Sequence, residues 1–228
     1  MTGRQNKQFI NISLPDDQTC PAYLSTVDSY QTGIIFLHDC WGLSQHSIEI
    51  ADNFADAGYA VLLPNLYRTA PPTHQQQADG MMDELEWEWA ATSVVAGARR
   101  FLREDCDKVV LLGLSMGSGI GLLAAAVHDD IDSYACFYGL PDLSKLKTEN
   151  INSPVQGHFI AADELDEWCP ASRVKDYLTM MEASQKPIDM HWYEGARHGF
   201  MNHSKPEMYC ADTCQLATKR TLDFFQST

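Results

Sequence analysis

Short hydrophobic runs recur along the chain, separated by amphipathic stretches and by turns rich in glycine, proline and polar residues. A run such as GIIFLH, apolar almost throughout and ending in a polar residue, is typical of a strand buried on both faces of a parallel sheet. Such runs predict strands at residues 9–14, 21–25, 33–38, 59–64, 108–113, 134–138, 155–161 and 188–193. The first two of these predict a starting hairpin.

Helical periodicity fills several of the intervals between these runs. From residue 47 to 57 the apolar side chains share one face, and Gly58 ends the pattern. Further helices are expected at about residues 82–103, directly after residue 115, and at about residues 206–225. Strands that alternate with helices predict an α/β fold with an open, mostly parallel, eight-stranded sheet, flanking helices and no large cap domain.

Length and composition narrow the class of protein. The 228 residues are expected to form a single domain over residues 1–228. Hydrophobic residues make up 45% and charged residues 21%, the balance of a soluble globular protein. No apolar run approaches the ~18 residues of a membrane span. The first residues, MTGRQNKQF, lack the apolar core of a secretory signal, so we expect a cytoplasmic protein.

The net charge and the spacing of the cysteines and histidines exclude further classes of protein. The 31 acidic and 16 basic residues give a formal charge of −15, which would repel phosphate backbones and anionic lipids. We therefore expect no nucleic-acid and no membrane partner. The seven cysteines include no CxxC pair and are interpreted as reduced thiols. The eight histidines lack HExxH spacing, so no metal site is expected.

The sequence Gly113-Leu114-Ser115-Met116-Gly117 matches the G-x-S-x-G pattern between a predicted strand and a predicted helix. In a nucleophile elbow the serine occupies a strained turn, and small neighbours prevent clashes with the adjacent strand and helix. Its hydroxyl then lies at the positive end of the helix dipole. The alternative is a chance match, which would not be expected to have a strand directly before it and a helix directly after it. The pattern therefore indicates Ser115 as a catalytic nucleophile.

A serine nucleophile needs a base, and in this arrangement the chain order is serine, acid, histidine. His198 lies in the loop just beyond the last predicted strand, where catalytic groups collect at the carboxyl ends of parallel strands. His191, inside that strand, is better explained by packing. His203, five residues further on, remains a second candidate. We predict His198 as the base.

The residues alone leave the acid open. The predicted strand at 155–161 leads into ADELDEWCPASR, which offers four carboxylates: Asp163, Glu164, Asp166 and Glu167. One of them is needed to orient the imidazole and to stabilise its charged form. The others would be solvated charges of a surface loop.

Several phrases in this order resemble the dienelactone hydrolase family: IIFLHDCWG, IADNFADAGYAVLLPNLY, GLSMG, DEWCPASR, HWYEGARHGF and RTLDFF. The resemblance covers nearly the whole chain from Gly33 onward. It implies a catalytic aspartate in a D-x-x-x-P stretch, which is Asp166 here, whereas Asp163 fits only if residues are inserted after it.

The resemblance also implies roles for residues after the third predicted strand. Asp39 matches an acidic residue that contacts the nucleophile in the resting state. The backbone amides of Cys40 and Met116 match the two donors of the oxyanion hole. From the residues alone, Asp39 is equally suited to cap the following helix, and Cys40 to be a core thiol.

Two departures from the family pattern bear on the substrate. Defining members use cysteine as nucleophile, whereas Ser115 stands here and needs histidine as general base. Defining members also bind a substrate carboxylate with arginines, and Asn202 stands where one of them is expected. Arg68 is the remaining candidate for a carboxylate contact.

Aromatic residues near the predicted catalytic loops are candidates to line a substrate pocket, or else pack beneath it: Trp41, Tyr67, Trp168 and Phe200. Of these, Trp41 and Trp168 are assigned to substrate binding, together with Asp39 and Arg68. The stretch from Glu84 to Trp89 fits either a lid edge or an amphipathic helix with inward tryptophans.

These observations predict a serine hydrolase that cleaves a small carboxylic ester or lactone through an acyl-enzyme. One alternative is a broad carboxylesterase, thioesterase or acyl-peptidase, because the triad is common to all of them. A second alternative is a non-catalytic binding protein on the same fold, against which the intact set of serine, histidine and acid argues.

Overall fold

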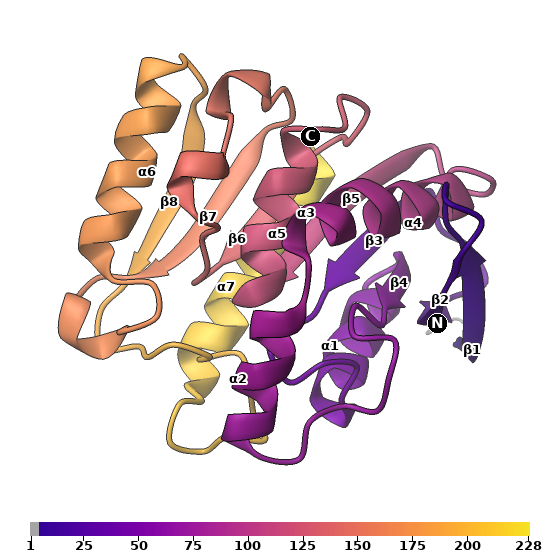
Figure 1. Cartoon of the computed structure of the whole chain (residues 1–228). Helices are drawn as coiled ribbons and strands as arrows, with labels where there is room; N and C mark the ends of the chain where they lie inside the picture. The colour runs from indigo at the N-terminus through magenta and orange to yellow at the C-terminus, as the bar shows by residue number, and fades with distance from the viewer. Residues whose placement is uncertain (1–4) are drawn as a thin grey trace. The chain divides into compact units, whose positions relative to one another are not determined.

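The computed structural model describes residues 5–228, which adopt an α/β fold with an eight-stranded, mostly parallel sheet and flanking helices (Figure 1). This confirms the fold class expected from the hydrophobic pattern. By internal packing the chain divides into two compact units, residues 1–112 and 113–228. The single domain expected over residues 1–228 stays a prediction. In the described part of the chain, no helix is long and apolar enough to cross a membrane.

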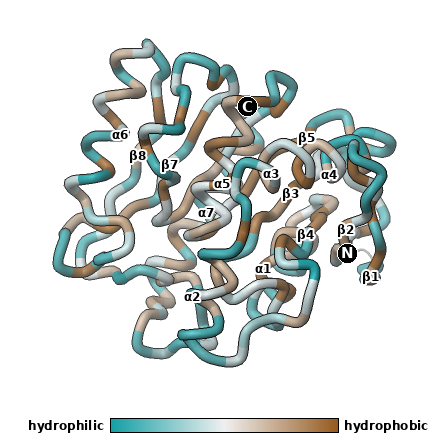
Figure 2. The backbone as a smooth tube through the Cα atoms, in the orientation of Figure 1, coloured by the Kyte–Doolittle hydropathy of each residue, from teal (hydrophilic) through white to brown (hydrophobic). Residues whose placement is uncertain are grey.

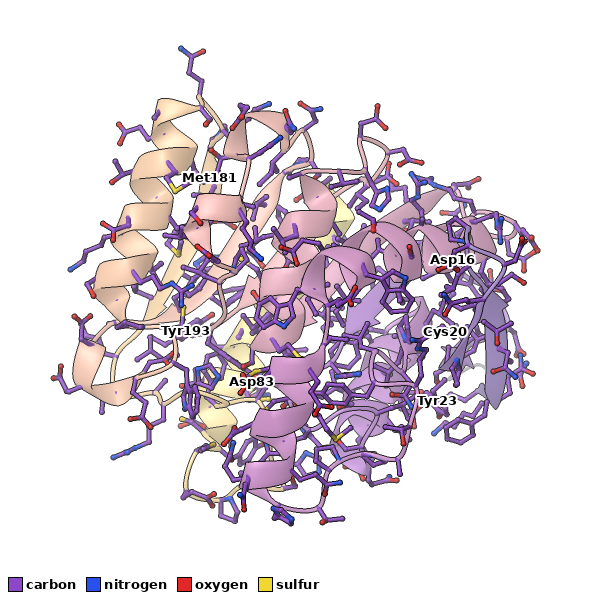
Figure 3. All side chains as sticks on the ribbon, in the orientation of Figure 1. Asp16, Cys20, Tyr23, Asp83, Met181 and Tyr193 are labelled. Atoms are coloured by element: carbon purple, nitrogen blue, oxygen red, sulfur yellow. The ribbon has the colours of Figure 1, made fainter. Side chains whose placement is uncertain are left out.

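The first unit begins with the expected hairpin. β1 (Asn6–Ser13) pairs antiparallel with β2 (Thr19–Thr26), and β2 pairs antiparallel with β4 (Ala60–Pro64). β3 (Thr32–Leu37) then pairs parallel with β4. Every residue of β4 is buried, as a strand covered on both faces requires, and hydrophobic colours follow β3 and β4 in Figure 2. Tyr23 of β2, labelled in Figure 3, reaches outside the sheet to the Asp52 carboxylate at 2.8 Å.

Helix α1 (Gln45–Asp56) follows β3 and has the boundaries that its capping residues impose. The side chain of Ser44 accepts a hydrogen bond from the amide of Ser47, the arrangement of an N-cap. At the other end Gly58 adopts φ +101°, a conformation that glycine reaches without a steric penalty.

The prediction of one long helix at about residues 82–103 is wrong, both in where the helix begins and in its continuity. The chain forms α2 (Gln75–Glu84), α3 (Trp87–Trp89), a π-helical turn (Ala90–Val94) and α4 (Val95–Leu102). The break lies at Leu85 and Glu86, whose backbones are extended and which no sequence signal marks as a stop. In the stretch from Glu84 to Trp89 both tryptophans are half-buried and all three glutamates are exposed, but the extended backbone at Leu85 and Glu86 interrupts the amphipathic helix expected there.

The second unit carries the strands that follow the boundary at β5 (Lys108–Leu114). β6 (Tyr134–Phe137), β7 (Val155–Ile160) and β8 (Ile188–Tyr193) are parallel neighbours in that order. Its helices are α5 (Met116–Ala125), α6 (Ala171–Ala183) and α7 (Ala211–Ser227). In Figure 1, α6 lies beside β7 and β8. The sequence pattern did not predict α6, and α7 begins at Ala211 rather than near residue 206.

A buried polar cluster joins β7, β8 and α7 around His158, whose side chain is fully buried. Its Nδ1 lies 2.7 Å from the Tyr193 hydroxyl, and its Nε2 lies 2.8 Å from Gln156 Oε1 and 3.1 Å from Thr221 Oγ1. The Gln156 amide donates to Asp189, which orients the carbonyl oxygen of Gln156 toward the imidazole. Both nitrogens of a neutral imidazole are therefore hydrogen-bonded, as burial of a polar ring demands.

Candidate active site

The nucleophile elbow is present between β5 and α5. Ser115 lies between the two elements with φ +51° and ψ −115°, a strained backbone for a residue with a side chain. Gly113 makes the turn possible, because a Cβ there would lie 2.6 Å from the Gly117 carbonyl oxygen. The Ser115 amide donates to the Phe137 carbonyl at 2.9 Å, which ties the turn to the end of β6.

Gly139 is a residue of this site that sequence reasoning missed. A Cβ at this position would overlap the backbone carbonyl of Ser115, so only glycine lets the chain after β6 lie against the elbow. The hydroxyl of Ser118 donates to the Gly139 carbonyl at 2.7 Å and holds the two segments together. The signal available in the sequence is a glycine just beyond a predicted strand, which also fits an ordinary turn.

Three predicted side chains form a continuous hydrogen-bond chain within the second unit. Ser115 Oγ lies 2.7 Å from His198 Nε2, and His198 Nδ1 lies 2.9 Å from Asp166 Oδ1. An ionised carboxylate only accepts, so Nδ1 carries the proton and Nε2 is left to accept from the serine hydroxyl. The Asp166 side chain is fully buried, whereas 16% of the His198 side chain is exposed. The arrangement is that of a nucleophile, a base and an orienting acid.

The structure separates the two candidate aspartates. Asp166 Oδ1 also accepts from the amides of Trp168 and Cys169, at 3.1 and 2.8 Å, which holds the carboxylate in position for the imidazole. Asp163 is exposed, begins a short 3₁₀ turn (Asp163–Leu165), and accepts from the amide of Ser172 at 2.8 Å, in the first turn of α6. The sequence-based preference for Asp166 over Asp163 therefore has a geometric basis.

Aromatic rings hold the imidazole of His198 in place. The ring of Tyr138 meets it edge-on with centroids 5.1 Å apart, and Phe200 packs edge-on against Tyr138 at 4.9 Å. Tyr138 itself has φ +36°, a strained conformation beside the elbow that the sequence did not indicate. The Trp168 ring lies 6.5 Å from that of His198 and is 48% exposed, so it borders the triad and faces solvent. Phe200 is fully buried and packs beneath these rings.

The other histidines lie apart from this chain of hydrogen bonds. His191, within β8, lies 3.3 Å from the Asp189 carboxylate and beside His158, as expected of a packed histidine. His203 is exposed, and its ring lies 6.4 Å from that of Tyr209.

Asp39 and Cys40 lie in the first unit, in a turn that directly follows β3. The Gly42 amide donates to the Asp39 carbonyl at 3.1 Å, which closes a β-turn, and the Trp41 amide donates to Asp39 Oδ1 at 2.9 Å. Asp39 is buried, and Ser44 rather than Asp39 caps α1. The helix-cap alternative for Asp39 is therefore wrong. Met116, the other predicted oxyanion donor, is the first residue of α5 in the second unit.

Arg68 has partners of its own within the first unit. Its backbone has φ +55°, its Nη1 lies 2.5 Å from Gln18 Oε1, and its guanidinium carbon lies 4.6 Å above the ring of Trp89. The guanidinium stacks as a cation over an aromatic face, a contact of about 0.5–2 kcal/mol. Together with Tyr67 these residues line a cavity of about 450 Å³.

His38, which sequence reasoning passed over, is fully buried at the end of β3. Its Nδ1 lies 2.7 Å from the Asp39 carbonyl, and its Nε2 accepts from the Leu66 amide at 3.1 Å. Because a carbonyl only accepts and an amide only donates, the ring is neutral with its proton on Nδ1. Burial lowers the pKa of His38 to about 4.

Acid is expected to destabilise the fold through His38. An unfolded histidine binds its proton with a pKa of 6.5, whereas folded His38 does so only near 4. Below pH ~6.5 the unfolded chain therefore binds more protons, and the free energy of unfolding falls by up to about 3 kcal/mol by pH ~4. Burial also lowers the pKa of His158, which acts in the same direction.

Urea unfolding at pH 7, 5.5 and 4.5 measures this fall. The variant His38→Asn should be less stable at neutral pH and should show a shallower dependence of stability on pH. An unchanged slope in His38→Asn would contradict the assignment.

Comparison with known proteins extends the resemblance seen in the sequence. Protein usf of Aquifex pyrophilus is 27% identical over 214 residues, which cover 90% of this chain and 91% of that protein. A carboxymethylenebutenolidase of Pseudomonas putida is 29% identical over 203 residues, 84% of each chain. The structure of a Klebsiella pneumoniae protein assigned as a dienelactone hydrolase superposes with a TM-score of 0.86 at 19% identity, over 99% of this chain and all of its own.

The family model for dienelactone hydrolases matches residues 20–228, from β2 through α7. The matched range contains the elbow, the D-x-x-x-P stretch and the loop with His198. The chain belongs to the dienelactone hydrolase family.

Proposed function

We propose that this protein is a serine hydrolase that cleaves a small carboxylic ester or lactone through an acyl-enzyme. The observation that carries the proposal is the hydrogen-bond chain from Ser115 through His198 to Asp166, with the serine on a strained elbow at the start of a helix. Fixing these groups before substrate binds avoids the entropy cost of assembling them during the reaction.

In the proposed mechanism, Ser115 Oγ attacks the substrate carbonyl carbon while its proton passes to His198 Nε2. The Asp166 carboxylate holds the imidazole and stabilises the imidazolium that forms. The tetrahedral intermediate collapses, the bond from carbon to the alcohol oxygen breaks, and His198 returns the proton to that oxygen. His198 then takes a proton from water as the water oxygen attacks the acyl carbon. The bond from that carbon to Ser115 Oγ breaks, and His198 returns the proton to Oγ, which releases the carboxylic acid and regenerates Ser115.

The amides of Cys40 and Met116 are proposed as oxyanion donors, each worth about 3–4 kcal/mol of transition-state stabilisation. Met116 directly follows the nucleophile and is the first residue of α5, where the helix dipole favours negative charge. Support for Cys40 comes from the family resemblance of the turn after β3. Asp39 and Trp41, in the same turn, are proposed as substrate-binding residues.

Family membership and the exposed ring of Trp168 support a small, cyclic or aryl substrate. The indole stands beside His198 with nearly half of its surface in solvent, so it is placed to cover an apolar group at the triad. The proposal needs no cofactor.

Labelling with a fluorophosphonate probe, followed by peptide mapping, tests the proposed nucleophile. A serine hydrolase should be labelled at Ser115, whereas a binding protein on the same fold should not react. A panel of lactones, aryl esters, thioesters and acyl-peptides then separates lactonase from carboxylesterase, thioesterase and peptidase activities. Absence of both labelling and turnover would contradict the proposed function.

We expect neutral lactones or esters to be hydrolysed at least as well as their carboxylated analogues. Losing a guanidinium from a substrate carboxylate contact typically costs ~2–5 kcal/mol. Asn202 stands where the family pattern has an arginine, and the Arg68 guanidinium already contacts Gln18 and Trp89. The measurement is kcat/KM for a neutral lactone and its carboxylated analogue at two ionic strengths.

Arg68→Ala is the matched variant for this comparison, and it should leave the ratio of the two kcat/KM values within about threefold of wild type. A preference for the anion that salt weakens and Arg68→Ala removes would contradict the prediction. That result would identify Arg68 as a residue that binds the substrate carboxylate.

A further inference from the structure

The nucleophile elbow holds the segment that follows β6 at two neighbouring points. The Ser115 amide donates to the Phe137 carbonyl at 2.9 Å. The Ser118 hydroxyl, three residues further along the chain in α5, donates to the Gly139 carbonyl at 2.7 Å. The Gly139 backbone also packs directly on the Ser115 carbonyl, which a Cβ would overlap. Both neighbours of Tyr138 in the chain are therefore attached to the elbow.

These attachments fix Tyr138 in a conformation that it would otherwise avoid. Its amide donates to the His158 carbonyl at 2.9 Å, which continues the pairing of β6 with β7, and its backbone has φ +36°. A residue with a side chain keeps such a backbone only where its surroundings impose it, at a cost of about 1–3 kcal/mol. The elbow and β7 thus determine where the Tyr138 side chain points.

The side chain directed in this way is a fully buried ring next to the proposed base. Its centroid lies 5.1 Å from that of the His198 imidazole, and Phe200, also fully buried, packs against it at 4.9 Å. Trp168 borders the imidazole as well, but at 6.5 Å and with half of its surface in solvent. Of these two neighbours, Tyr138 is the closer one and is enclosed by protein.

The imidazole needs such a neighbour because one hydrogen bond does not fix a ring. The bond from Nδ1 to Asp166 leaves the His198 ring able to tilt about that contact, which would carry Nε2 away from the Ser115 hydroxyl. A rigid ring packed beside the imidazole opposes the tilt before substrate binds. Proton transfer from Ser115 depends on the 2.7 Å contact that is kept in this way.

We propose that Tyr138 is a positioning residue that keeps the His198 imidazole aligned with Ser115, and that Ser118 holds Tyr138 to the nucleophile elbow. The inference rests on the proposed function, in which His198 takes the proton of Ser115. Every contact in it joins residues of the second unit. The elbow thereby sets the position of the base as well as that of the nucleophile.

Two substitutions of Tyr138 separate its ring from its hydroxyl. Tyr138→Leu removes the ring beside His198, whereas Tyr138→Phe keeps it. We expect kcat to fall on the order of 10²-fold in Tyr138→Leu, with KM little changed, because misplacing a catalytic group by about 1 Å has an effect of that size. The rate constant for fluorophosphonate labelling of Ser115 should fall by a similar factor. Tyr138→Phe should keep kcat within about threefold of wild type.

Ser118→Ala tests the attachment of Tyr138 to the elbow. It removes the hydroxyl that donates to the Gly139 carbonyl and should lower kcat on the order of tenfold, since the Ser115 amide still holds the other neighbour of Tyr138. In Tyr138→Leu the ring through which Ser118 acts is already absent. The double variant should therefore match Tyr138→Leu within about threefold, rather than show the product of the two losses.

Tyr177→Leu is the matched control, because it makes the same exchange at a fully buried tyrosine of α6. It should lower Tm while kcat stays within about threefold of wild type. If Tyr138→Leu does not fold, Tyr138→Met repeats the removal of the ring with a flexible side chain that fills irregular space.

The outcomes distinguish this inference from the proposed function. If wild type neither turns over esters nor reacts with the fluorophosphonate, the proposed function fails, and the inference fails with it. If wild type is active, the inference alone fails when folded Tyr138→Leu keeps kcat within about threefold, or when Tyr138→Phe loses as much as Tyr138→Leu. It also fails if both Tyr138→Leu and Tyr138→Met unfold where Tyr177→Leu remains folded. Full activity in Ser118→Ala, or additive losses in the double variant, would overturn the role of Ser118.

Discussion

Ser115→Ala is expected to lower kcat for ester or lactone hydrolysis by about 10⁴-fold or more. The substitution removes the oxygen that lies 2.7 Å from His198 Nε2 and leaves no group to form the acyl-enzyme. Alanine and serine share the backbone constraints at φ +51°, so the elbow itself should persist. The lost hydrogen bond is worth about 1 kcal/mol, which changes Tm by no more than about 4 °C.

Turnover, fluorophosphonate labelling and Tm measured on the same preparations test this expectation. The matched control is Ser144→Ala, which removes a serine hydroxyl bonded to Asp142 in the 3₁₀ turn Leu143–Lys145. That control should keep wild-type activity and labelling. A folded Ser115→Ala protein with more than about a tenth of wild-type activity would assign the nucleophile to another residue.

Asp166→Asn is expected to reduce kcat by about 10⁴-fold, whereas Asp163→Asn should leave it near the wild-type value. The side-chain amide introduced by Asp166→Asn would offer a donor or a weaker acceptor to His198, so the imidazole tautomer with its proton on Nδ1 loses its support. The imidazolium formed during the reaction also loses a buried negative charge. These effects act on the transition state, so kcat should fall much more than KM rises.

The two variants are closely matched, because each replaces one carboxylate oxygen of an aspartate by an amide nitrogen, at positions three residues apart. In Asp163→Asn the side-chain oxygen still accepts from the Ser172 amide, so α6 keeps its N-terminal hydrogen bond and stability should change by less than about 1 kcal/mol. Steady-state kinetics on both variants, with urea unfolding, make the comparison. The reverse order of the two kcat values would move the role of the acid to Asp163.

The sequence alone was sufficient for the features that depend on local pattern. Strands such as β8, predicted at residues 188–193, follow from hydrophobic runs whose length and flanking residues reflect burial on a sheet. The elbow follows from small residues that must be adjacent in the chain, so its glycines and Ser115 appear together as a motif. His198 was recognisable because it lies just past a strand end, where parallel strands deliver their loops.

Features that depend on which distant segments meet were decided by the tertiary structure. Asp163 and Asp166 have the same chemistry and nearly the same position in the chain. The fold packs the His198 loop against residues 166–169, so Asp166 forms the hydrogen bond to the imidazole. Asp163 instead accepts a hydrogen bond from the first turn of α6. Gly139 likewise became meaningful only when the end of β6 was placed against the elbow.

The same reason explains the break in the helix predicted at 82–103 and the roles of His38 and Arg68. Periodicity continues through Leu85 and Glu86, but helix propensity is weak, and tertiary contacts determine where a helix stops. His38 looks like the polar end of a strand, and the hydrogen bond that its Nε2 accepts comes from the Leu66 amide, in the turn after another strand. Hydrophobic period and motif spacing are local properties that a sequence displays, whereas the partner of a buried polar group is chosen by chain segments that the fold brings together.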